Sequence, residues 1–571
     1  MIWKASVTWF LVLAAALPAA AQQLTTKRLE TTAMPLATVA APLPKGGKLS
    51  LTLDQAYELA LKRNLNLQVG RFDVARANTN IFSQASIFDP QLSAGVNGDW
   101  SRSPAATQLA GAEVTEGRNT RFNLGLDWLL PSGTTFNVTA DTARSETNSQ
   151  FFFLNPRWTT SMNFTLKQPL LQGFGTLVNR AGIVIARNSR AQTAAGFAIT
   201  VIDTLRQVEN AYWDLVAARR SIAVKQRSLE LAERLHRETQ ERVKVGTSAP
   251  IDLVQSTAAV AARKQELIAA QNAADDAEDT LKALLGFDQP GEWNIEISTA
   301  ERLDVPPIHP ALATSIEAAL KNRPEIHQEL LALESLKLNV RVARNQTLPR
   351  LDLQATYGWS GLGGDLTIVD RDTGQVIQRI SGGLNDAVTQ LTNRDFPNWT
   401  LGVTLGIPLG NNAAKAKLAE QRFQLQQELV RLQSLKQQII RQVRVAVRAV
   451  KDGAANIDAA KASREAAERN LEAEETKFSN GLSTNYQILQ IQDDLARAEL
   501  TELQARVTYR KAVVGLRVAT GALLDDEHVA IVDPGQPRIP HDFWKSVRWL
   551  QFTDFKRNGK QAQPAKKESS S

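Results

Sequence analysis

The sequence contains no cysteine in its 571 residues and only five histidines. The lack of cysteine excludes disulfide frameworks, thiolate nucleophiles and cysteine-based zinc sites together. The histidines are scattered without the spacing of metal ligands. A nucleotide-binding loop, an H-E-x-x-H motif and a G-x-S-x-G motif are also missing. We therefore expect a protein that is not an enzyme and that has no cofactor and no metal site.

Long hydrophobic runs are missing as well, except at the N-terminus. Residues 1–21 combine Lys4, an apolar run from Val7 to Leu17 and the small residues Ala19 to Ala21, which is the pattern of a cleaved signal peptide. The alternative is a membrane anchor, but the run is short for a span. No later apolar run reaches about 18 residues. A mature chain that crosses a membrane would therefore have to do so as a β-barrel.

Charge of one sign is only slightly in excess, with a net charge of +7. No block of lysine and arginine lies beside aromatic residues, as nucleic-acid binding would favour. We expect no nucleic-acid partner and interpret the charge as surface electrostatics.

The chain after the N-terminus is an internal duplication. The motif ALKRNL at Ala60 to Leu65 resembles ALKNRP at Ala319 to Pro324, and LKALLG at Leu281 to Gly286 resembles LRVATG at Leu516 to Gly521. Such self-similarity indicates two copies of one structural unit. The expected organisation is a signal peptide (1–21), a linker (22–48), a first repeat (49–298), a connection (299–308), a second repeat (309–533) and a mobile C-terminal tail (534–571).

Each repeat contains a very long helix. In the second repeat, apolar residues from Leu425 to Val450 follow the 4-3 spacing of a coiled-coil seam. The pattern of the first repeat extends from about Leu177 to Val245, or roughly 100 Å of helix. Both helices are interrupted by glycine, at Gly246 and Gly481, where we expect the chain to reverse direction. A structural coiled coil would also show heptads, but it would explain neither the signal peptide nor the strands.

Between the helices lie segments that alternate strictly between apolar and polar residues. In RFNLGLDWLL (121–130), for example, Phe122, Leu124, Leu126 and Trp128 share one face. Alternation over about ten residues with aromatic residues near the ends is typical of transmembrane β-strands. A soluble sandwich is the alternative, and the signal peptide and the small number of strands disfavour it. The tryptophans of these strands are candidates for an interfacial aromatic belt: Trp100, Trp128, Trp158, Trp359 and Trp399.

Together, the long helices, the strands, the duplication and the two glycine breaks resemble the TolC family of outer-membrane efflux and secretion channels. The resemblance covers nearly the whole mature chain. Its most specific points are LTLDQAYELALKRNLNL (51–67), QPLLQGFG (168–175) and the pair VKVGTSAPIDLVQS (243–256) and FSNGLSTNYQILQI (478–491).

The resemblance implies an α+β membrane protein, in which a trimeric transmembrane β-barrel is continued by a long periplasmic α-helical coiled-coil barrel. It implies the channel component of a tripartite efflux or type I secretion system, a passive exit duct in the cell outer membrane that extends into the periplasm. The implied partners are two further copies in a homotrimer, a periplasmic adaptor (membrane fusion) protein, an inner-membrane pump acting through the adaptor, and outer-membrane lipid. A non-conducting scaffold that bridges outer membrane and cell wall is the alternative that we keep open.

The resemblance also assigns site residues. The periplasmic tips, where an adaptor docks, comprise Val245, Gly246, Thr247 and Ser248 in the first repeat and Asn480, Gly481, Leu482, Ser483 and Thr484 in the second. Glycine tolerates the positive φ of such a turn, and we expect the serine and threonine residues to cap the returning helices. The passage between barrel and helices comprises Pro90, Pro169, Gly173, Gly175, Pro349 and Pro408.

The entrance differs from the family pattern. The acidic pair after the second tip is replaced by Gln487 and Gln490, while Asp252 matches the aspartate after the first tip. The usual basic partner of that aspartate is Ser483 here, and the usual tyrosine is Phe478. We therefore expect no ionic lock of the familiar kind. The candidate gate and pore-lining residues are Asp252, Gln487, Gln490, Asp493 and Asp494, with a solvated helix face as the alternative interpretation.

The first repeat has extra residues that predict a further hairpin. RFNLGLDWLL and TTFNVTADT flank the tight turn Pro131 to Gly133, with longer polar loops at about 101–119 and 144–157. Our hypothesis is that this hairpin adds two membrane strands, giving six per protomer and 18 per trimer instead of the family's usual 12. The alternative is a hairpin that projects outside the membrane.

Overall fold

A computed structural model describes residues 47–105, 110–149, 151–301, 303, 306–369 and 376–529, all of which belong to the unit Ala40–Val532. The expected signal peptide, nearly all of the linker and the C-terminal tail lie outside the described residues. The first repeat consists of β1 (Lys48–Leu51), α3 (Leu53–Arg63), α4 (Leu65–Ala85), η1 (Ser86–Phe88), β2 (Gln91–Pro104), β3 (Val114–Leu129), β4 (Thr135–Thr147), β5 (Leu154–Pro169), α5 (Thr176–Asn179), α6 (Ala181–Lys244), α7 (Pro250–Leu285) and β6 (Glu296–Thr299).

The second repeat follows the same order of helices, strands, long helix and returning helix. It consists of α8 (Leu312–Asn322), α9 (Pro324–Gln346), β7 (Arg350–Val369), β8 (Val376–Ile380), α10 (Leu384–Asn393), β9 (Phe396–Gly406), α11 (Asn412–Ser479), α12 (Asn485–Thr520) and α13 (Leu523–Asp526). Both returning helices, α7 and α12, end at a glycine with positive φ, 77° at Gly286 and 72° at Gly521. These equivalent ends agree with the duplication read from the sequence.

Both repeats contribute to one antiparallel sheet. Its long strands follow the order β2-β3-β4-β5-β7-β9, and the short β8 pairs with the far part of β7. The predicted hairpin at 121–142 lies within β3 and β4, in the middle of this order. The strands are longer than expected: β2 extends to Pro104 and β3 begins at Val114. The polar loops expected at 101–119 and 144–157 are therefore too long, because their ends continue the strand pairing.

The strand register gives the sheet two chemically different faces. One row of directly opposed residues consists of Leu92, Leu126, Val138, Phe164, Tyr357 and Trp399. The adjacent row consists of Ser93, Gly125, Thr139, Asn163, Gly358 and Asn398. Because side chains alternate along a strand, these rows define an apolar face and a polar face.

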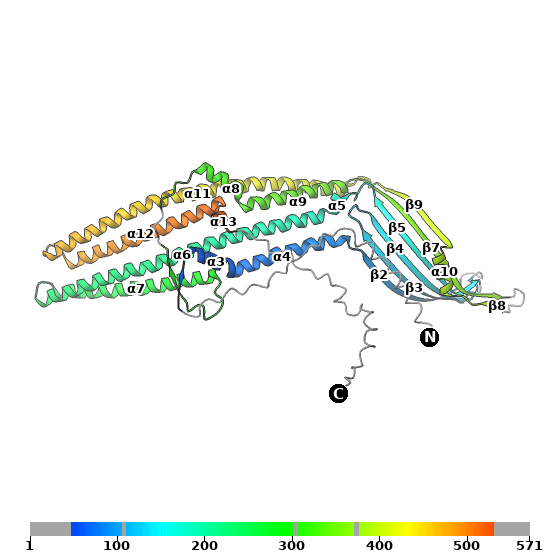
Figure 1. Ribbon diagram of the computed structural model, residues 1–571, viewed down its shortest axis with the longest axis horizontal. Helices are drawn as coiled ribbons and strands as arrows, with labels where there is room; N and C mark the ends of the chain where they lie inside the picture. The colour runs from blue at the N-terminus through cyan, green and yellow to red at the C-terminus, as the bar shows by residue number, and fades with distance from the viewer. Residues whose placement is uncertain are drawn as a thin grey trace, which may run out of the picture. The chain divides into compact units, whose positions relative to one another are not determined.

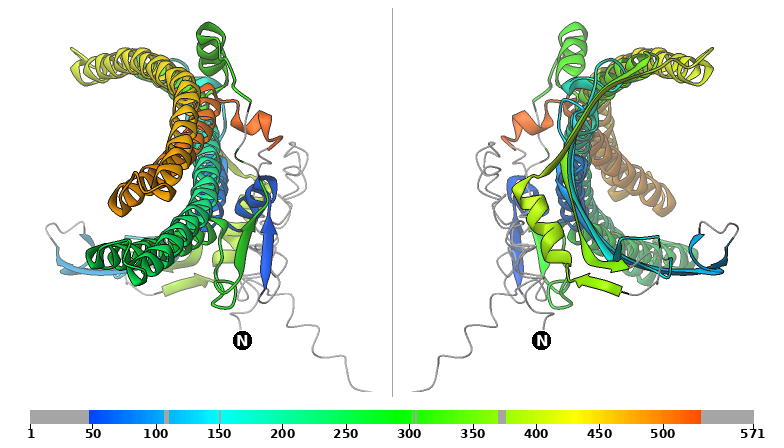
Figure 2. Two further views of the ribbon diagram at one scale, coloured as in Figure 1. Left: turned by 90° about the vertical axis from the view of Figure 1, so that its left-hand side faces the viewer. Right: turned by 90° about the vertical axis from the view of Figure 1, so that its right-hand side faces the viewer.

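The position of α10 shows which face is convex. A Cβ added to Gly361 would meet the carbonyl oxygen of Ala387 at 2.0 Å, and one added to Gly363 would meet that of Gly383 at 2.1 Å. Both glycines belong to the apolar face, so α10 lies on that face. In Figure 2 the sheet is curved and α10 lies on its convex side. The apolar face is therefore convex and the polar face is concave.

Four helices continue from the sheet. Contacts join α4 to α6, α6 to α9 and α9 to α11, and farther on α7 returns along α6 and α12 along α11 (Figure 1). The sheet lies at one end of these helices and the two helical turns lie at the other (Figure 1). The long helices predicted from the coiled-coil spacing are α6, with 64 residues, and α11, with 68. Within the described residues, no helix has the combined length and apolar character needed to span a bilayer.

The hydrophobic core lies on the helices and not in the sheet. Its largest cluster includes Leu51, Leu205, Tyr212, Trp213 and Leu285, each at most 1% exposed. The hydroxyl of Tyr212 donates to the carbonyl of Leu51 at 3.0 Å. This core holds β1 and its parallel partner β6 against α6 and α7, whereas the apolar face of the sheet stays largely uncovered.

Candidate functional site

Both helical hairpins turn through the same backbone motif. In the first tip, the N–H of Gly246 donates to the carbonyl of Val243 at 3.1 Å and that of Thr247 to Arg242 at 2.9 Å. In the second tip, Gly481 donates to Phe478 and Leu482 to Lys477 at the same two distances. This pair of bonds is the Schellman motif, which requires a left-handed residue at the turn. Gly246 and Gly481 supply it, with φ of 79° and 73°.

The returning helix of the second tip begins as expected. Thr484 is the N-cap of α12, and its hydroxyl accepts from the N–H of Gln487 at 3.3 Å. The cap expected from Ser483 is wrong, because its hydroxyl donates to the buried carboxylate of Glu474 at 2.5 Å. This hydrogen bond, followed by the ion pair with Lys477, lowers the pKa of Glu474 below its ordinary value.

The returning helix of the first tip begins differently from our expectation. Pro250 occupies the first position of α7, so Ala249 becomes the N-cap. Its N–H donates to the carboxylate of Asp252 at 3.2 Å. Capping of α7 by Thr247 or Ser248 is therefore wrong. The hydroxyl of Thr247 instead donates to the carbonyl of Arg242, at the end of the outgoing helix, at 3.1 Å.

Two contacts join the first tip to the second. The guanidinium of Arg242 lies 4.1 Å from the ring centroid of Phe478 and is 3.4 Å from the carbonyl oxygen of the same residue. Asn485, only 5% exposed, donates to the carbonyl of Asp252 and accepts from the hydroxyl of Thr239, both at 3.2 Å. These contacts involve Thr239, Arg242 and Asp252 of the first repeat and Phe478 and Asn485 of the second, and we call this group the tip latch. It contains no ion pair between the two tips.

Arg242, Thr239 and Asn485 are not among the site residues predicted from the sequence. The available signal was weak, since polar residues near a coiled-coil seam are common. Only the structure shows that Thr239 is 1% exposed and hydrogen-bonded across the two hairpins. A buried polar group with a partner in the other repeat is informative because an unsatisfied one would cost about 1–3 kcal/mol.

The candidate gate residues have separate environments. Asp252 contacts its own tip and Asn485, as described above, while Gln487 and Gln490 are exposed. Asp493 pairs with Arg263 of α7 at 2.5 Å, and Asp494 pairs with Arg497 at 2.6 Å. Asp493 and Asp494 therefore do not form an uncompensated acidic pair within one protomer.

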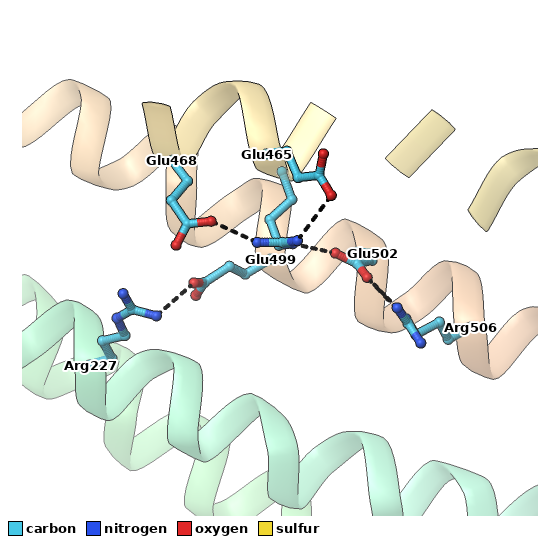
Figure 3. Close-up of polar contacts among 7 residues, drawn as sticks. Arg227, Glu465, Glu468, Glu499, Glu502 and Arg506 are labelled. Atoms are coloured by element: carbon cyan, nitrogen blue, oxygen red, sulfur yellow. Dashed lines mark hydrogen bonds and ion pairs between the residues drawn. The ribbon is translucent and has the colours of Figure 1, made fainter. Parts of the chain in front are cut away.

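An ionic cluster joins the repeats farther from the tips (Figure 3). Arg464 of α11 contacts the carboxylates of Glu465, Glu468 and Glu502 at 3.8, 2.8 and 2.6 Å. Burial acts to raise the pKa of Glu502, but hydrogen bonds from Arg506 and Arg464 outweigh burial and hold the pKa below its ordinary value. Glu502 of α12 is therefore held as an anion between two arginines.

The same cluster reaches the first repeat through Glu499. Its carboxylate lies 3.4 Å from the guanidinium of Arg227 on α6 (Figure 3). Burial raises the pKa of Glu499. Three helices from both repeats, α6, α11 and α12, are thereby connected by charge about midway along α12.

The predicted passage residues lie at transitions between strands and helices. They flank η1 and β2, β5 and α5, α9 and β7, and β9 and α11: Pro90, Pro169, Gly173, Gly175, Pro349 and Pro408. Gly173 and Gly175 have φ of 82° and 97°, which favours glycine over other residues. The side-chain amide of Asn179 donates to both of their carbonyls, at 2.8 and 2.9 Å. These glycines therefore form the bend from strand to helix.

All five predicted belt tryptophans lie on the apolar face. In the strand register, Trp128 is near the helix end of the sheet, and Trp100 and Trp158 are near the opposite end. Trp399 is close to the start of β9, opposite Tyr357 of β7. Trp359 lies between these levels and packs edge-on against Phe164, with ring centroids 5.7 Å apart. The tryptophans thus occur at both ends of the apolar rows.

A curved sheet with an apolar convex face, continued by long paired helices, is the fold of outer-membrane channel proteins. The family model "Outer membrane efflux protein" matches residues 56–287 and 315–522. These two segments cover more than half of the chain and coincide with the two repeats, so the chain belongs to this family. Membership places it in the outer membrane with an extension into the periplasm. The family is one of transport proteins and not of enzymes.

Two curated relatives share part of this sequence. The pyoverdine export outer membrane protein OpmQ of Pseudomonas putida is 26% identical over 314 residues, and that of Pseudomonas aeruginosa is 24% identical over 324. The alignments cover 54% and 56% of this chain and 61% of each relative. The chain therefore matches less than two thirds of the length of these relatives.

Solved structures confirm the fold at low sequence identity. The Campylobacter jejuni CmeC outer membrane channel superposes with a TM-score of 0.60 at 16% identity, covering 84% of this chain and 89% of CmeC. The outer-membrane channel OprN superposes with a TM-score of 0.60 at 17% identity, covering 86% of this chain and 96% of OprN. The predicted architecture of barrel strands continued by long helices is thus confirmed.

Proposed function

We propose that this chain is the exit duct of a tripartite efflux or type I secretion assembly. Three copies would form the duct, with the concave polar face of each sheet toward the lumen. Cargo would enter between the helical tips from an inner-membrane pump and a periplasmic adaptor, and it would leave through the barrel. Two relatives are named for pyoverdine export, and export is the direction that we propose here.

The observation that carries this proposal is the exposed apolar surface at both tips. Val245 and Ile251 of the first tip are 72% and 59% exposed, and Leu482 and Tyr486 of the second are 78% and 66% exposed. Ile251 and Tyr486 occupy equivalent positions in the two repeats. Exposed apolar residues clustered at the end of a helical hairpin favour a protein partner, and helical hairpins of an adaptor would suit both tips.

The apolar face supports contact with outer-membrane lipid. Along β3 and the residue that follows it, this face is apolar from Phe122 to Leu130, a length of roughly 27 Å. At a tilt of about 40° the rows would rise about 20 Å, close to the apolar band of outer-membrane barrels. The first charged residue beyond these rows is Arg144 on β4. The tryptophans at both ends of the rows would lie at the two membrane interfaces.

The adaptor interface is tested by charge at the tips. We expect Leu482→Asp and Tyr486→Asp to abolish co-purification of the adaptor encoded beside the pump, while trimer yield stays unchanged. The matched control is Gln504→Asp, which places the same charge on an exposed position of α12 away from the turn. Adaptor binding that survives both tip substitutions would contradict docking at this surface.

The duct itself is tested by conductance in planar bilayers. If the protein is a duct, the purified trimer should conduct. If it is a scaffold that bridges outer membrane and cell wall, the trimer should not conduct. A trimer that never conducts, even after substitution of Asp252, Asp493 and Asp494, would favour the scaffold. Export that continues in cells lacking the protein would do the same.

A further inference from the structure

We propose that three copies of this chain close an 18-stranded barrel, with β9 of each copy paired to β2 of the next. This inference rests on the proposed function only in taking the three-copy duct as given. The sheet of one chain is open, so the barrel is incomplete without the partner copies. What is new is the pair of strand edges that meet between copies and the number of strands that surround the exit.

The two edges of the sheet have free pairing groups. Among the described strands, β2 pairs only with β3, and β9 pairs only with β7. Their apolar residues are strongly exposed, with Val96 of β2 at 67% and Trp399 and Val403 of β9 at 75% and 65%. An open sheet edge within a bilayer would leave its backbone groups without partners, which is not tolerated. The opposite edge of the sheet in a neighbouring copy supplies the missing partner.

The directions of the edges allow this closure. All neighbouring long strands are antiparallel, and their number within one chain is even. The strands β2 and β9 therefore run in opposite directions. Joining β9 of one copy to β2 of the next continues the antiparallel pattern around the whole barrel, as single-chain outer-membrane barrels do.

The width of the sheet fits the width of the helical layer. Six strands spaced about 4.8 Å apart and tilted by about 40° occupy roughly 38 Å around a barrel. The four helices that continue from the sheet, α4, α6, α9 and α11, occupy roughly 32–40 Å at their usual spacing. Four strands at the same tilt would occupy only about 25 Å. With the additional hairpin β3–β4, the sheet of one chain is therefore about as wide as the layer of four helices that continues from it.

The concave face suits an open aqueous lumen. Most of its residues are serine, threonine, asparagine and glycine, which are small. Its charged residues in the long strands balance, with four acidic and four basic: Asp99, Asp127, Asp141, Asp352, Arg121, Arg157, Lys167 and Arg350. At the helix end, Asp352 pairs with Arg350 and Lys167 at 2.6 and 3.1 Å. Closing 18 strands gives a backbone diameter of about 36 Å, wide enough for water-filled passage.

Cysteine cross-linking tests the closure directly, because the chain has no cysteine of its own. One cysteine replaces Leu92, Ala94 or Val96 on β2, and a second replaces Trp399, Leu401 or Val403 on β9. The set samples several registers across the new seam. We expect at least one pair to give three covalently joined chains on a denaturing gel after oxidation. The positive control is Leu124→Cys with Ala140→Cys, which are directly opposite on β3 and β4 within one chain.

The competing arrangement leaves the β3–β4 hairpin outside the barrel and pairs β2 with β5 in the same chain. It predicts an intrachain cross-link between Ala94→Cys and Met162→Cys. That cross-link would overturn the proposal even if Leu124→Cys and Ala140→Cys still react, because a hairpin outside the barrel keeps its own pairing. In the structure, β3 and β4 separate Ala94 from Met162, so we expect this pair not to react.

Deletion of the hairpin tests the width. A variant lacking residues 110–147 brings β2 beside β5 in the correct antiparallel sense, so that it can close only 12 strands, with a diameter of about 24 Å at the same tilt. Neutral polyethylene glycols of increasing size, added on the barrel side in planar bilayers, should enter the complete channel at sizes that the variant excludes. Equal size limits would overturn the proposal. If the variant fails to assemble, the cross-links decide the strand number.

If the complete trimer conducts but β2 cross-links to β5, the strand number is wrong and the duct remains. If the seam cross-links but no trimer conducts, the duct is wrong.

Discussion

The guanidinium of Arg242, from the first repeat, lies 4.1 Å from the ring of Phe478, from the second repeat. Arg242 also lies within hydrogen-bonding distance of the backbone carbonyl of Phe478. The sequence suggested that the ionic lock of the family is missing here, and this contact shows what joins the two tips instead. A cation held over an aromatic ring needs no carboxylate partner.

Loss of the Arg242–Phe478 contact should favour opening of the tips. A cation–π contact is worth about 1 kcal/mol at a partly exposed site, so Phe478→Leu or Arg242→Ala should raise the open probability about fivefold. Single-channel recording of the purified trimer measures this change. Lys244→Ala is the control, because Lys244 pairs with Glu241 of its own helix and, among the described residues, with no group of the second repeat. An open probability equal to that of the unmodified protein would show that the contact does not restrain opening.

Asn485 should matter more for stability than its size suggests. Its side-chain amide bridges Thr239 and the backbone of Asp252, and its burial leaves water little access. Asn485→Ala should lower the free energy of unfolding by about 1–3 kcal/mol. Asn485→Asp should be worse, because a carboxylate cannot donate to the carbonyl of Asp252. Thermal unfolding followed by circular dichroism ranks the three proteins, and the reverse order for Ala and Asp would contradict the assigned hydrogen bonds.

The two tip glycines should be needed for their backbone conformation alone. A Cβ at Gly246 or Gly481 would meet no atom within 4 Å, but both residues have positive φ. Substitution by alanine should therefore destabilise by about 1–2 kcal/mol each. Gly515→Ala in α12 is the matched control, since its Cβ also meets nothing and its φ is ordinary. That substitution should stabilise the helix by up to about 1 kcal/mol. Equal melting shifts at all three positions would contradict this reasoning.

The pair Glu329 and Glu428 should make stability depend on pH. A hydrogen bond with Glu428, together with burial, raises the pKa of Glu329 from 4.5 to about 7. The folded chain thus binds a proton that the unfolded chain releases. The stabilising contribution is complete below about pH 4.5 and is lost as the pH rises to about 7.

Replacement of Glu329 by glutamine tests this dependence, because the amide keeps a donor at every pH. The melting temperature of Glu329→Gln should exceed that of the unmodified protein at pH 8 and approach it at pH 5. The gain should stay below about 1 kcal/mol, since solvent screens a partly exposed pair. Glu334→Gln, an exposed position of α9, is the control. An equal effect at both pH values would exclude a shared proton.

Local signals in the sequence predicted much of this fold. Seam spacing located α6 and α11, and strict alternation located the strands, because these patterns reflect the periods of a helix and a strand. Positive φ at the end of a helix is nearly confined to glycine, so the turns at Gly246 and Gly481 could be placed to the residue. Capping was less predictable: Thr484 caps α12, but Pro250 moved the other N-cap to Ala249.

By itself, the sequence determined the duplication, the two faces of the six long strands and the positions of the two helical turns, since each follows from local patterns of residues. Only the tertiary structure decided that β3 and β4 lie between β2 and β5, because strand order depends on pairing between distant segments. It also brought Arg242 to Phe478, which lie in different repeats. Contacts across a repeat boundary have no local period, and their energies appear only when the two hairpins pack together.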